Sequence, residues 1–173
     1  MQQSNNICHY WRKDAGLVET ISRIVKSKRV LEIFAGNGYL ASCLEDSGVT
    51  ITPTTLLSSH DGHGLWKYHN VIEKEASCAI SELGNEHDIL LICWPTVSDA
   101  ALKAIEKWGP DKPIIYVGEM PTPWLGAAGM LQGCATDAFF DNFNVTETLN
   151  SYKTTNMMER AVVGYYSPRL KDK

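Results

Sequence analysis

The sequence has no long hydrophobic run. None of the apolar stretches in its 173 residues approaches the roughly 20 residues that a membrane-spanning helix requires. The chain begins with polar residues, from Met1 to Asn6, and so lacks the apolar segment of a secretory signal peptide. These two absences predict a cytoplasmic protein with no membrane partner.

Paired cysteines are also absent. The five cysteines are odd in number and widely spaced, and no two of them form a Cys-x-x-Cys pair. A disulfide framework is indicated by an even number of cysteines, and a structural zinc site by closely spaced pairs. We therefore expect no metal site and reduced, mostly buried thiols. The cysteines are Cys8, Cys43, Cys78, Cys93 and Cys134.

Positive charge is scarce. The chain has 16 Lys and Arg against 20 Asp and Glu, for a formal net charge of -4. Because nucleic-acid binding depends on clustered cations, this balance argues against a nucleic-acid partner. Hydrophobic residues make up 44% and charged residues 21%, which is the balance of a globular chain. The length fits a single domain over 1–173, with a helical region at 1–27 and a polar tail at 168–173.

Residues 30–41 carry the most informative pattern. The apolar run 30–34 is typical of a strand buried on both faces of a parallel sheet, although Glu32 interrupts it. A tight turn follows at 35–38 (sequence AGNG), and 39–44 then indicate the start of a helix. This order places backbone N–H groups at the carboxyl edge of a sheet, where nucleotide-like ligands bind. We expect the glycines there because a Cβ would hold a ligand away from the backbone.

The acid and the two glycines resemble motif I of class I S-adenosylmethionine (SAM)-dependent methyltransferases. Glu32 lies four positions before Gly36, which forms a Gly-x-Gly with Gly38. Family members commonly have a further glycine two residues before Gly36, where this chain has Phe34. The resemblance extends over roughly residues 15–167. It implies SAM as the cofactor and methyl transfer as the activity.

The remaining segments follow the order that this resemblance implies. Apolar periodicity predicts an amphipathic helix within 8–27 and further helices between the later strands. After the first strand, strands are predicted at 49–54, 71–72, 88–93, 113–117, 145–152 and 160–167. The implied fold class is α/β: a single-domain, three-layer α/β/α sandwich. Its sheet is seven-stranded, mostly parallel and methyltransferase-like, with an antiparallel C-terminal strand.

The resemblance also implies a set of site residues. The glycine turn would meet the methionine part of SAM, the ends of the second and third strands its ribose and adenine, and an aromatic residue its sulfonium. The expected cofactor-binding residues are Glu32, Ala35, Gly36, Asn37, Gly38, Thr54, Glu75, Ala76 and Trp94. Glu75 has an ordinary helix start as its alternative role. Glu119, at the end of the fifth strand, is the catalytic candidate for binding or deprotonating the acceptor, with capping of backbone N–H groups as the alternative.

Two features depart from the family pattern. The second strand ends at 52–55 (TPTT) with no acid for the ribose hydroxyls, and a neutral hydroxyl is a weaker partner than a carboxylate. The fourth strand ends in Trp94-Pro95 instead of the Asn/Asp-Pro-Pro-aromatic sequence of amino methyltransferases. The acceptor therefore stays open, and size and charge favour a small molecule.

Two other interpretations remain. Residues 36–41 fit the Gly-x-Gly-x-x-Ala pattern of dinucleotide-binding proteins, which would make the chain an NADP-binding oxidoreductase. Glu32 inside the strand opposes this interpretation, as does a length too short for a separate substrate domain. The missing ribose acid and the Trp94-Pro95 turn also fit a catalytically inactive, methyltransferase-like binding domain.

The N-terminal helical region holds further candidates. Residues 12–29 contain six Lys and Arg interleaved with Asp14 and Glu19. We interpret them first as a solvated helix face and second as an acceptor-binding patch. Tyr10 and Trp11 either contact a ligand or pack at the edge of the domain.

Two loops are also candidates. The loop 58–69 contains His60, Asp61, His63 and His69 but no recognised metal-ligand spacing, so a mobile loop at the rim of the cleft is favoured over a metal site. The long loop 120–134 follows the fifth strand, and long loops in compact domains are often functional. It would cover the pocket, with Trp124 as a lid residue.

Overall fold

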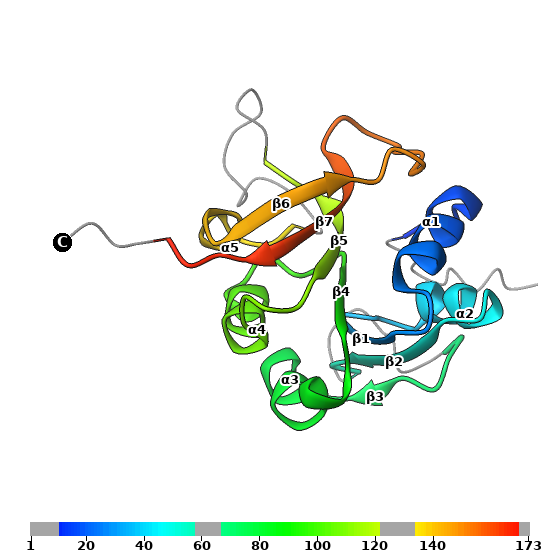
Figure 1. Cartoon of the computed structure of the whole chain (residues 1–173), viewed down its shortest axis with the longest axis horizontal. Helices are drawn as coiled ribbons and strands as arrows, with labels where there is room; N and C mark the ends of the chain where they lie inside the picture. The colour runs from blue at the N-terminus through cyan, green and yellow to red at the C-terminus, as the bar shows by residue number, and fades with distance from the viewer. Residues whose placement is uncertain (1–10, 58–66, 122–133, 170–173) are drawn as a thin grey trace, which may run out of the picture.

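The computed structural model of the chain describes residues 11–57, 67–121 and 134–169. It forms one seven-stranded sheet with helices on both faces (Figure 1). Among these residues, every helix is too short or too polar to cross a bilayer. The elements in chain order are α1 (Ala15–Val25), β1 (Arg29–Ile33), α2 (Tyr39–Asp46), β2 (Thr50–Thr55), β3 (Ile72–Glu73), α3 (Ala76–Leu83), the 3-10 turn η2 (Gly84–Glu86), β4 (Ile89–Cys93), α4 (Ala100–Trp108), β5 (Ile114–Glu119), α5 (Asp137–Asp141), β6 (Phe143–Thr148) and β7 (Glu159–Tyr166).

The strand order of the sheet is β3-β2-β1-β4-β5-β7-β6. The pairs β2–β3, β1–β2, β1–β4 and β4–β5 are parallel, whereas β7 is antiparallel to both β5 and β6. The strand order reverses between β1 and β4, and such a switch point opens a crevice at the carboxyl ends of the strands. The predicted α/β/α fold with an antiparallel C-terminal strand is confirmed.

Each face of the sheet has its own hydrophobic core (Figure 1). On one face α1 and α2 contribute Ile21 and Leu44, among others. On the other face α3, α4 and α5 pack, with Ile105 and Phe139 fully buried. All five residues of β4 are buried, as expected for a central strand covered on both faces.

The predicted strands 30–34, 49–54, 88–93 and 113–117 are shifted by one or two residues at their ends, and other elements differ for identifiable local reasons. The first helix begins only at Ala15, because the Asp14 side chain accepts a hydrogen bond from Leu17 N and caps it. The third strand lies at Ile72–Glu73, one residue later than predicted, because Val71 N donates to the His69 carbonyl in a turn. The strand pair lies at 143–148 and 159–166 instead of 145–152 and 160–167. The first of these strands ends early because a turn follows it, in which Tyr152 N donates to the Leu149 carbonyl at 3.1 Å.

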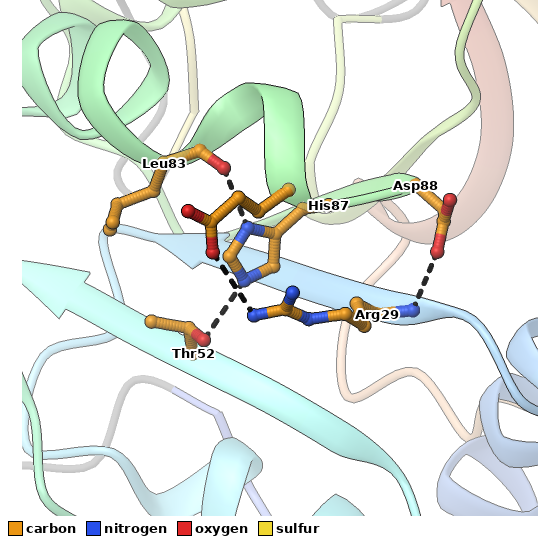
Figure 2. A network of polar contacts seen from close by, with 6 residues as sticks. Arg29, Thr52, Leu83, His87 and Asp88 are labelled. Carbon is orange, nitrogen blue, oxygen red and sulfur yellow. Dashed lines mark hydrogen bonds and ion pairs between the residues drawn. The ribbon is translucent and has the colours of Figure 1, made fainter.

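A network of polar contacts closes the amino edge of the sheet (Figure 2). The buried His87 ring lies 2.7 Å from the Leu83 carbonyl through Nδ1 and 2.9 Å from Thr52 Oγ1 through Nε2. Asp88 Oδ2 accepts from Arg29 N at 2.8 Å. These contacts join α3 to β2 and β4 to β1, and they satisfy backbone groups that would otherwise be unpaired.

Lys112, two residues before β5, adds further contacts to this network. Its Nζ donates to the carbonyls of Gly84 and His87 at 2.8 and 3.2 Å and lies 3.6 Å from the centroid of the Trp108 ring. Burial lowers the pKa of Lys112 and the nearby Asp88 raises it, with a net lowering. The amino edge is thus held by paired polar groups.

We expect His87→Ala to lower the free energy of unfolding by about 2 kcal/mol. The substitution leaves the Leu83 carbonyl and the Thr52 hydroxyl without their partner, and buried polar groups without partners cost about 1–3 kcal/mol. Urea denaturation followed by circular dichroism measures the change. Asn85→Ala, at an exposed position two residues away, is the matched control and should stay within about 0.5 kcal/mol of wild type. Equal losses in both variants would contradict the role of the His87 contacts.

Candidate functional site

The turn after β1 contains three residues with left-handed backbone. Gly36 and Gly38 have φ of 57° and 80°, and Phe34 has φ of 60°. The left-handed region of backbone conformation is unfavourable for residues other than glycine. Phe34 nevertheless adopts it, at the position where the resembled family commonly has glycine. Ala35 N donates to the Thr54 carbonyl at 3.0 Å, and Gly38 N to the Ala35 carbonyl at 2.9 Å. These two bonds fix the turn at the carboxyl ends of β1 and β2.

Gly38 is required by packing within the chain. A Cβ there would lie 2.7 Å from Val71 Cγ2 and 2.9 Å from His69 Cβ. The segment before β3 is also tied to the turn by Tyr68 N, which donates to the carbonyl of the buried Asn37 at 2.8 Å. We had expected the glycine to make room for a ligand. At Gly38 the room is taken by residues of the chain itself.

Glu32 is the buried acid of the site. Its side chain is 1% exposed, and Oε2 has no hydrogen-bond partner among the described residues. Burial raises the pKa of Glu32 from 4.5 to about 8, so the carboxyl group is mostly uncharged at neutral pH. Burial, followed by the charge of Glu32, also raises the pKa of Cys93 at the end of β4. Among the described residues, Glu32 Oε2 is therefore an unpaired buried acceptor next to the glycine turn.

Thr54 and Glu75 already have partners within the chain. Thr54 is fully buried, and its hydroxyl donates to the Glu32 carbonyl at 2.9 Å. Glu75 is the N-cap of α3, and its Oε2 accepts from Ser77 N at 2.9 Å and from Cys78 N at 3.1 Å. Burial raises the pKa of Glu75 while the hydrogen bonds from Ser77 and Cys78 lower it, with a net lowering.

Glu75 therefore has the alternative role expected for it, at the start of a helix. The contacts of Thr54, Glu75 and the buried Ala76 with a cofactor stay predictions.

Trp94 follows β4 with left-handed backbone of its own, at φ 49°. Its N–H donates to the Val117 carbonyl at 2.8 Å, which continues the pairing of β4 with β5. The indole Nε1 is buried without a hydrogen-bond partner in the described parts of the chain. The side chain lines a cavity of about 510 Å³.

This cavity lies between the start of α1, the end of β4 and the β6–β7 connection. Besides Trp94, its lining includes Arg12, Lys13, Asp14, Tyr152, Lys153 and Glu159. Asp14 joins two of the walls, because its Oδ1 caps α1 and its Oδ2 accepts from Lys153 N at 2.8 Å. The walls of the cavity are therefore fixed to each other by a buried carboxylate.

Glu119 and Glu159 are paired neighbours at the carboxyl edge, where β5 ends and β7 begins. Glu159 is buried and accepts from Thr155 N at 2.6 Å and from the Thr155 hydroxyl. Glu119 is partly exposed, and its Oε1 accepts from Asn156 Nδ2 at 3.1 Å. Asn156 Nδ2 also lies 3.3 Å from Glu159 Oε1, so one amide connects the two carboxylates. Of the two acids, Glu119 is the one left accessible at this edge.

Trp11 packs within the domain. It is 4% exposed, and its ring centroid lies 5.7 Å from that of Tyr39, which lies 4.7 Å from that of Tyr68. The neighbouring rings are tilted to each other, at 55° and 50°, and Tyr39 is the first residue of α2, so Trp11 follows the packing alternative. Among the described residues, no group of three or more His, Cys, Asp or Glu is arranged to bind a metal ion. Tyr10, His60, Asp61, His63 and Trp124 lie outside the described residues.

Sequence reasoning missed the cavity residues of the β6–β7 connection. Tyr152, Lys153 and Glu159 belong to no motif and follow the predicted sites by many residues. Only the antiparallel register of β5 with β7 brings Glu159 beside Glu119. The basic segment 12–29 was the one available signal, and of its cations Arg12 and Lys13 line the cavity.

Comparisons with known proteins identify the fold. No protein-family model and no curated protein sequence matches the chain. Among solved structures, a TehB-like SAM-dependent methyltransferase from Corynebacterium glutamicum matches with a TM-score of 0.54 and 13% identity over 88% of each chain. TehB from Haemophilus influenzae matches with a TM-score of 0.56 and 12% identity over 88% of this chain and 62% of its own. The glycopeptide N-methyltransferase MtfA, solved with S-adenosyl-L-homocysteine (SAH), matches with a TM-score of 0.54 and 11% identity over 94% of each chain.

These matches establish that the chain has the fold of class I SAM-dependent methyltransferases. At identities of 11–13% they show the fold alone. The chain also spans only 53–59% of the length of several other matched structures.

The buried Glu32 predicts a pH-dependent stability that Glu32→Gln should remove. The folded chain keeps the proton up to about pH 8, whereas the unfolded chain releases it near 4.5. The free energy of unfolding therefore falls as the pH rises through this window, by up to about 1.4 kcal/mol per pH unit, and levels off above it. Urea denaturation at about pH 5, 6.5 and 8.5 measures the slope in both proteins.

Glu106→Gln is the matched control, because Glu106 is exposed on α4 and far from the turn. This variant should keep the wild-type slope. If Glu32→Gln also keeps it, Glu32 is not the unpaired buried acid described above.

Proposed function

We propose that this chain binds SAM at the carboxyl edge of its sheet and transfers the methyl group to a small molecule. One observation carries the proposal. The neighbouring strands β1 and β4 both end in left-handed backbone at the switch point of the sheet, at Phe34 and Trp94. Beside these ends lie two buried polar atoms without partners among the described residues, Glu32 Oε2 and Trp94 Nε1. Backbone strain and unpaired buried groups together are typical of ligand-binding sites.

The residues at this edge suit the parts of SAM. The backbone of Ala35 to Gly38 would hold the methionine part, and Glu32 would hold the turn or bind the amino group through a water molecule. Uncharged Glu32 would ionise next to an ammonium group, since an opposite charge favours the charged form of an acid. Trp94 supplies an aromatic wall, and the face of an indole ring attracts a cationic sulfonium.

The end of β2 and the start of α3 would hold the ribose and adenine of SAM. Thr54, Glu75 and Ala76 are the candidates there. The two polar side chains would have to share or exchange their present partners, the Glu32 carbonyl for Thr54 and Ser77 for Glu75. The nearby backbone is an alternative partner for the ribose.

Bound SAM would supply an electrophilic methyl carbon. The protein has to align the acceptor with the carbon–sulfur bond, exclude water, and take the proton that the acceptor loses. Glu119 is the candidate for taking that proton, because its partly exposed carboxylate lies at the carboxyl end of β5 and shares the Asn156 amide with Glu159, which lines the cavity. Glu159 is less suited, since hydrogen bonds within the chain already occupy it.

The strand order argues against the dinucleotide alternative. The dinucleotide-binding fold has the order 3-2-1-4-5-6 with parallel strands, whereas here the antiparallel β7 lies between β5 and β6. The matched structures described above likewise include methyltransferases. An inactive relative would share the fold and differ in ligand binding or turnover.

Calorimetric titration separates these functions. We expect SAM and SAH to bind and NADP not to bind. Binding of NADP alone would favour the oxidoreductase, and binding of none of the three would favour the inactive relative.

Gly36→Asp should weaken SAM binding by at least about tenfold. At φ 57° an aspartate is among the better tolerated L-residues, so the fold should survive. The added carboxylate would crowd the turn and repel the carboxylate of SAM. Gly48→Asp is the matched control, because Gly48 also has positive φ, at 85°, and open space around its Cβ position. Calorimetry on both variants, with circular dichroism to confirm folding, measures the effect, and equal SAM affinity in the two variants would contradict this use of the turn.

Glu119→Gln should leave the affinity for SAM within about twofold of wild type and slow methyl transfer by about 100-fold. Single-turnover release of SAH, with an acceptor found by screening small molecules, measures the rate. Glu147→Gln, on the exposed strand β6, is the control. An unchanged rate in Glu119→Gln would remove Glu119 from the mechanism.

A further inference from the structure

We propose that the cavity beside Trp94 is the acceptor site and that it takes a small, flat molecule bearing an anionic oxygen group, a carboxylate or a phosphate. This inference rests on the proposed methyl transfer and names the class of acceptor. It depends on the charges, the hydrogen bonds and the aromatic wall of the cavity.

The cations of the cavity are free to bind a ligand. Three lining side chains are cationic, Arg12, Lys13 and Lys153, and all three are exposed. Within the described parts of the chain none of them forms an ion pair. The start of α1 also borders the cavity through Ala15 and Gly16, and the carboxylate of Asp14 already caps it. In a chain with a net charge of -4, the cavity thus has three exposed cations against two acids, Asp14 and Glu159.

The two acids of the cavity do not compete for these cations. Both Asp14 oxygens accept backbone hydrogen bonds, from Leu17 N and Lys153 N, each at 2.8 Å. The Glu159 carboxylate accepts from Thr155 and Asn156 and lies 3.5 Å from the Tyr152 hydroxyl. These hydrogen bonds hold the walls together, and among the described residues neither carboxylate forms an ion pair with a lining cation.

The Tyr152 hydroxyl stays protonated beside these acids. Burial, followed by the charge of Glu159, raises its pKa. Tyr152 therefore adds a neutral hydrogen-bonding group to the lining.

Size and shape favour a small flat molecule. The cavity volume of about 510 Å³ lies within the usual range for small-molecule sites, about 300–1,000 Å³. Trp94 and Tyr152 line it with their aromatic side chains. Trp94 also borders the proposed methyl-donor site. A ligand that contacts both Trp94 and the cations would lie beside the methyl group.

Matched pairs of acids and amides test the proposal. Ligand-observed NMR measures the binding of benzoate against benzamide and of indole-3-acetate against indole-3-acetamide, with and without SAH. Each acid should bind about tenfold or more tightly than its amide, a ratio that corresponds to about 1.4 kcal/mol. The affinity for phenyl phosphate, measured in the same way and compared with that for benzoate, shows whether the cavity prefers a phosphate or a carboxylate.

Variants show whether the cavity cations cause the preference. Arg12→Gln and Lys153→Gln should each lower the acid-to-amide ratio severalfold while leaving the affinity for SAH unchanged. Lys107→Gln, an exposed position on α4, should preserve both. Substituting Lys153 retains its backbone N–H and therefore the bond to Asp14.

Three results would overturn the proposal. Equal binding of acids and amides would show that the cavity does not select anions. A large loss of SAH affinity in Arg12→Gln and Lys153→Gln would assign the cations to the carboxylate of the cofactor. Acid selectivity in a protein that binds no SAH would refute methyl transfer and the acceptor role, while leaving an anion site in place.

Discussion

The left-handed backbone at Phe34 is the constraint on which the cleft depends. A side chain at φ 60° costs roughly 1 kcal/mol or more, and the bonds between β1 and β2 offset this cost. Ala35 N donates to the Thr54 carbonyl, and the Thr54 hydroxyl donates to the Glu32 carbonyl. These bonds lock the two strand ends together, which positions the glycine turn and the start of α2. Trp94 repeats the arrangement at the end of β4, where its N–H is bonded to β5.

The order of elements was predictable because local patterns carry it. Short apolar runs such as 30–34 and 88–93 became the central strands β1 and β4, and the stripe within 8–27 became α1. The glycine turn was predictable for the same reason, since its residues are consecutive in the sequence. The antiparallel C-terminal strand followed from the family resemblance, as no local pattern of β7 specifies its partner.

Contacts between distant segments could not be predicted. The sequence suggests that a glycine at position 38 makes room for a ligand. In the structure, His69 and Val71 occupy the space that a Cβ there would need. Lys153 N donates to the Asp14 carboxylate and so joins two walls of the cavity, although the two residues are 139 apart in the sequence. Such pairs depend on the strand register and on how α1 packs over the sheet. Neither is visible in composition or periodicity.

The two edges of the sheet differ in how their polar groups are satisfied. At the amino edge His87 and Lys112 bring buried donors and acceptors together, as Figure 2 shows for His87. At the carboxyl edge Glu32 Oε2 and the indole nitrogen of Trp94 are buried without partners in the described residues, and both strand ends there are strained. Unpaired buried groups destabilise a folded chain, so an edge that retains them gives up stability that the opposite edge keeps. A ligand with a cationic group and an oxygen acceptor would supply both missing partners, which is why the carboxyl edge is the part of this fold suited to binding.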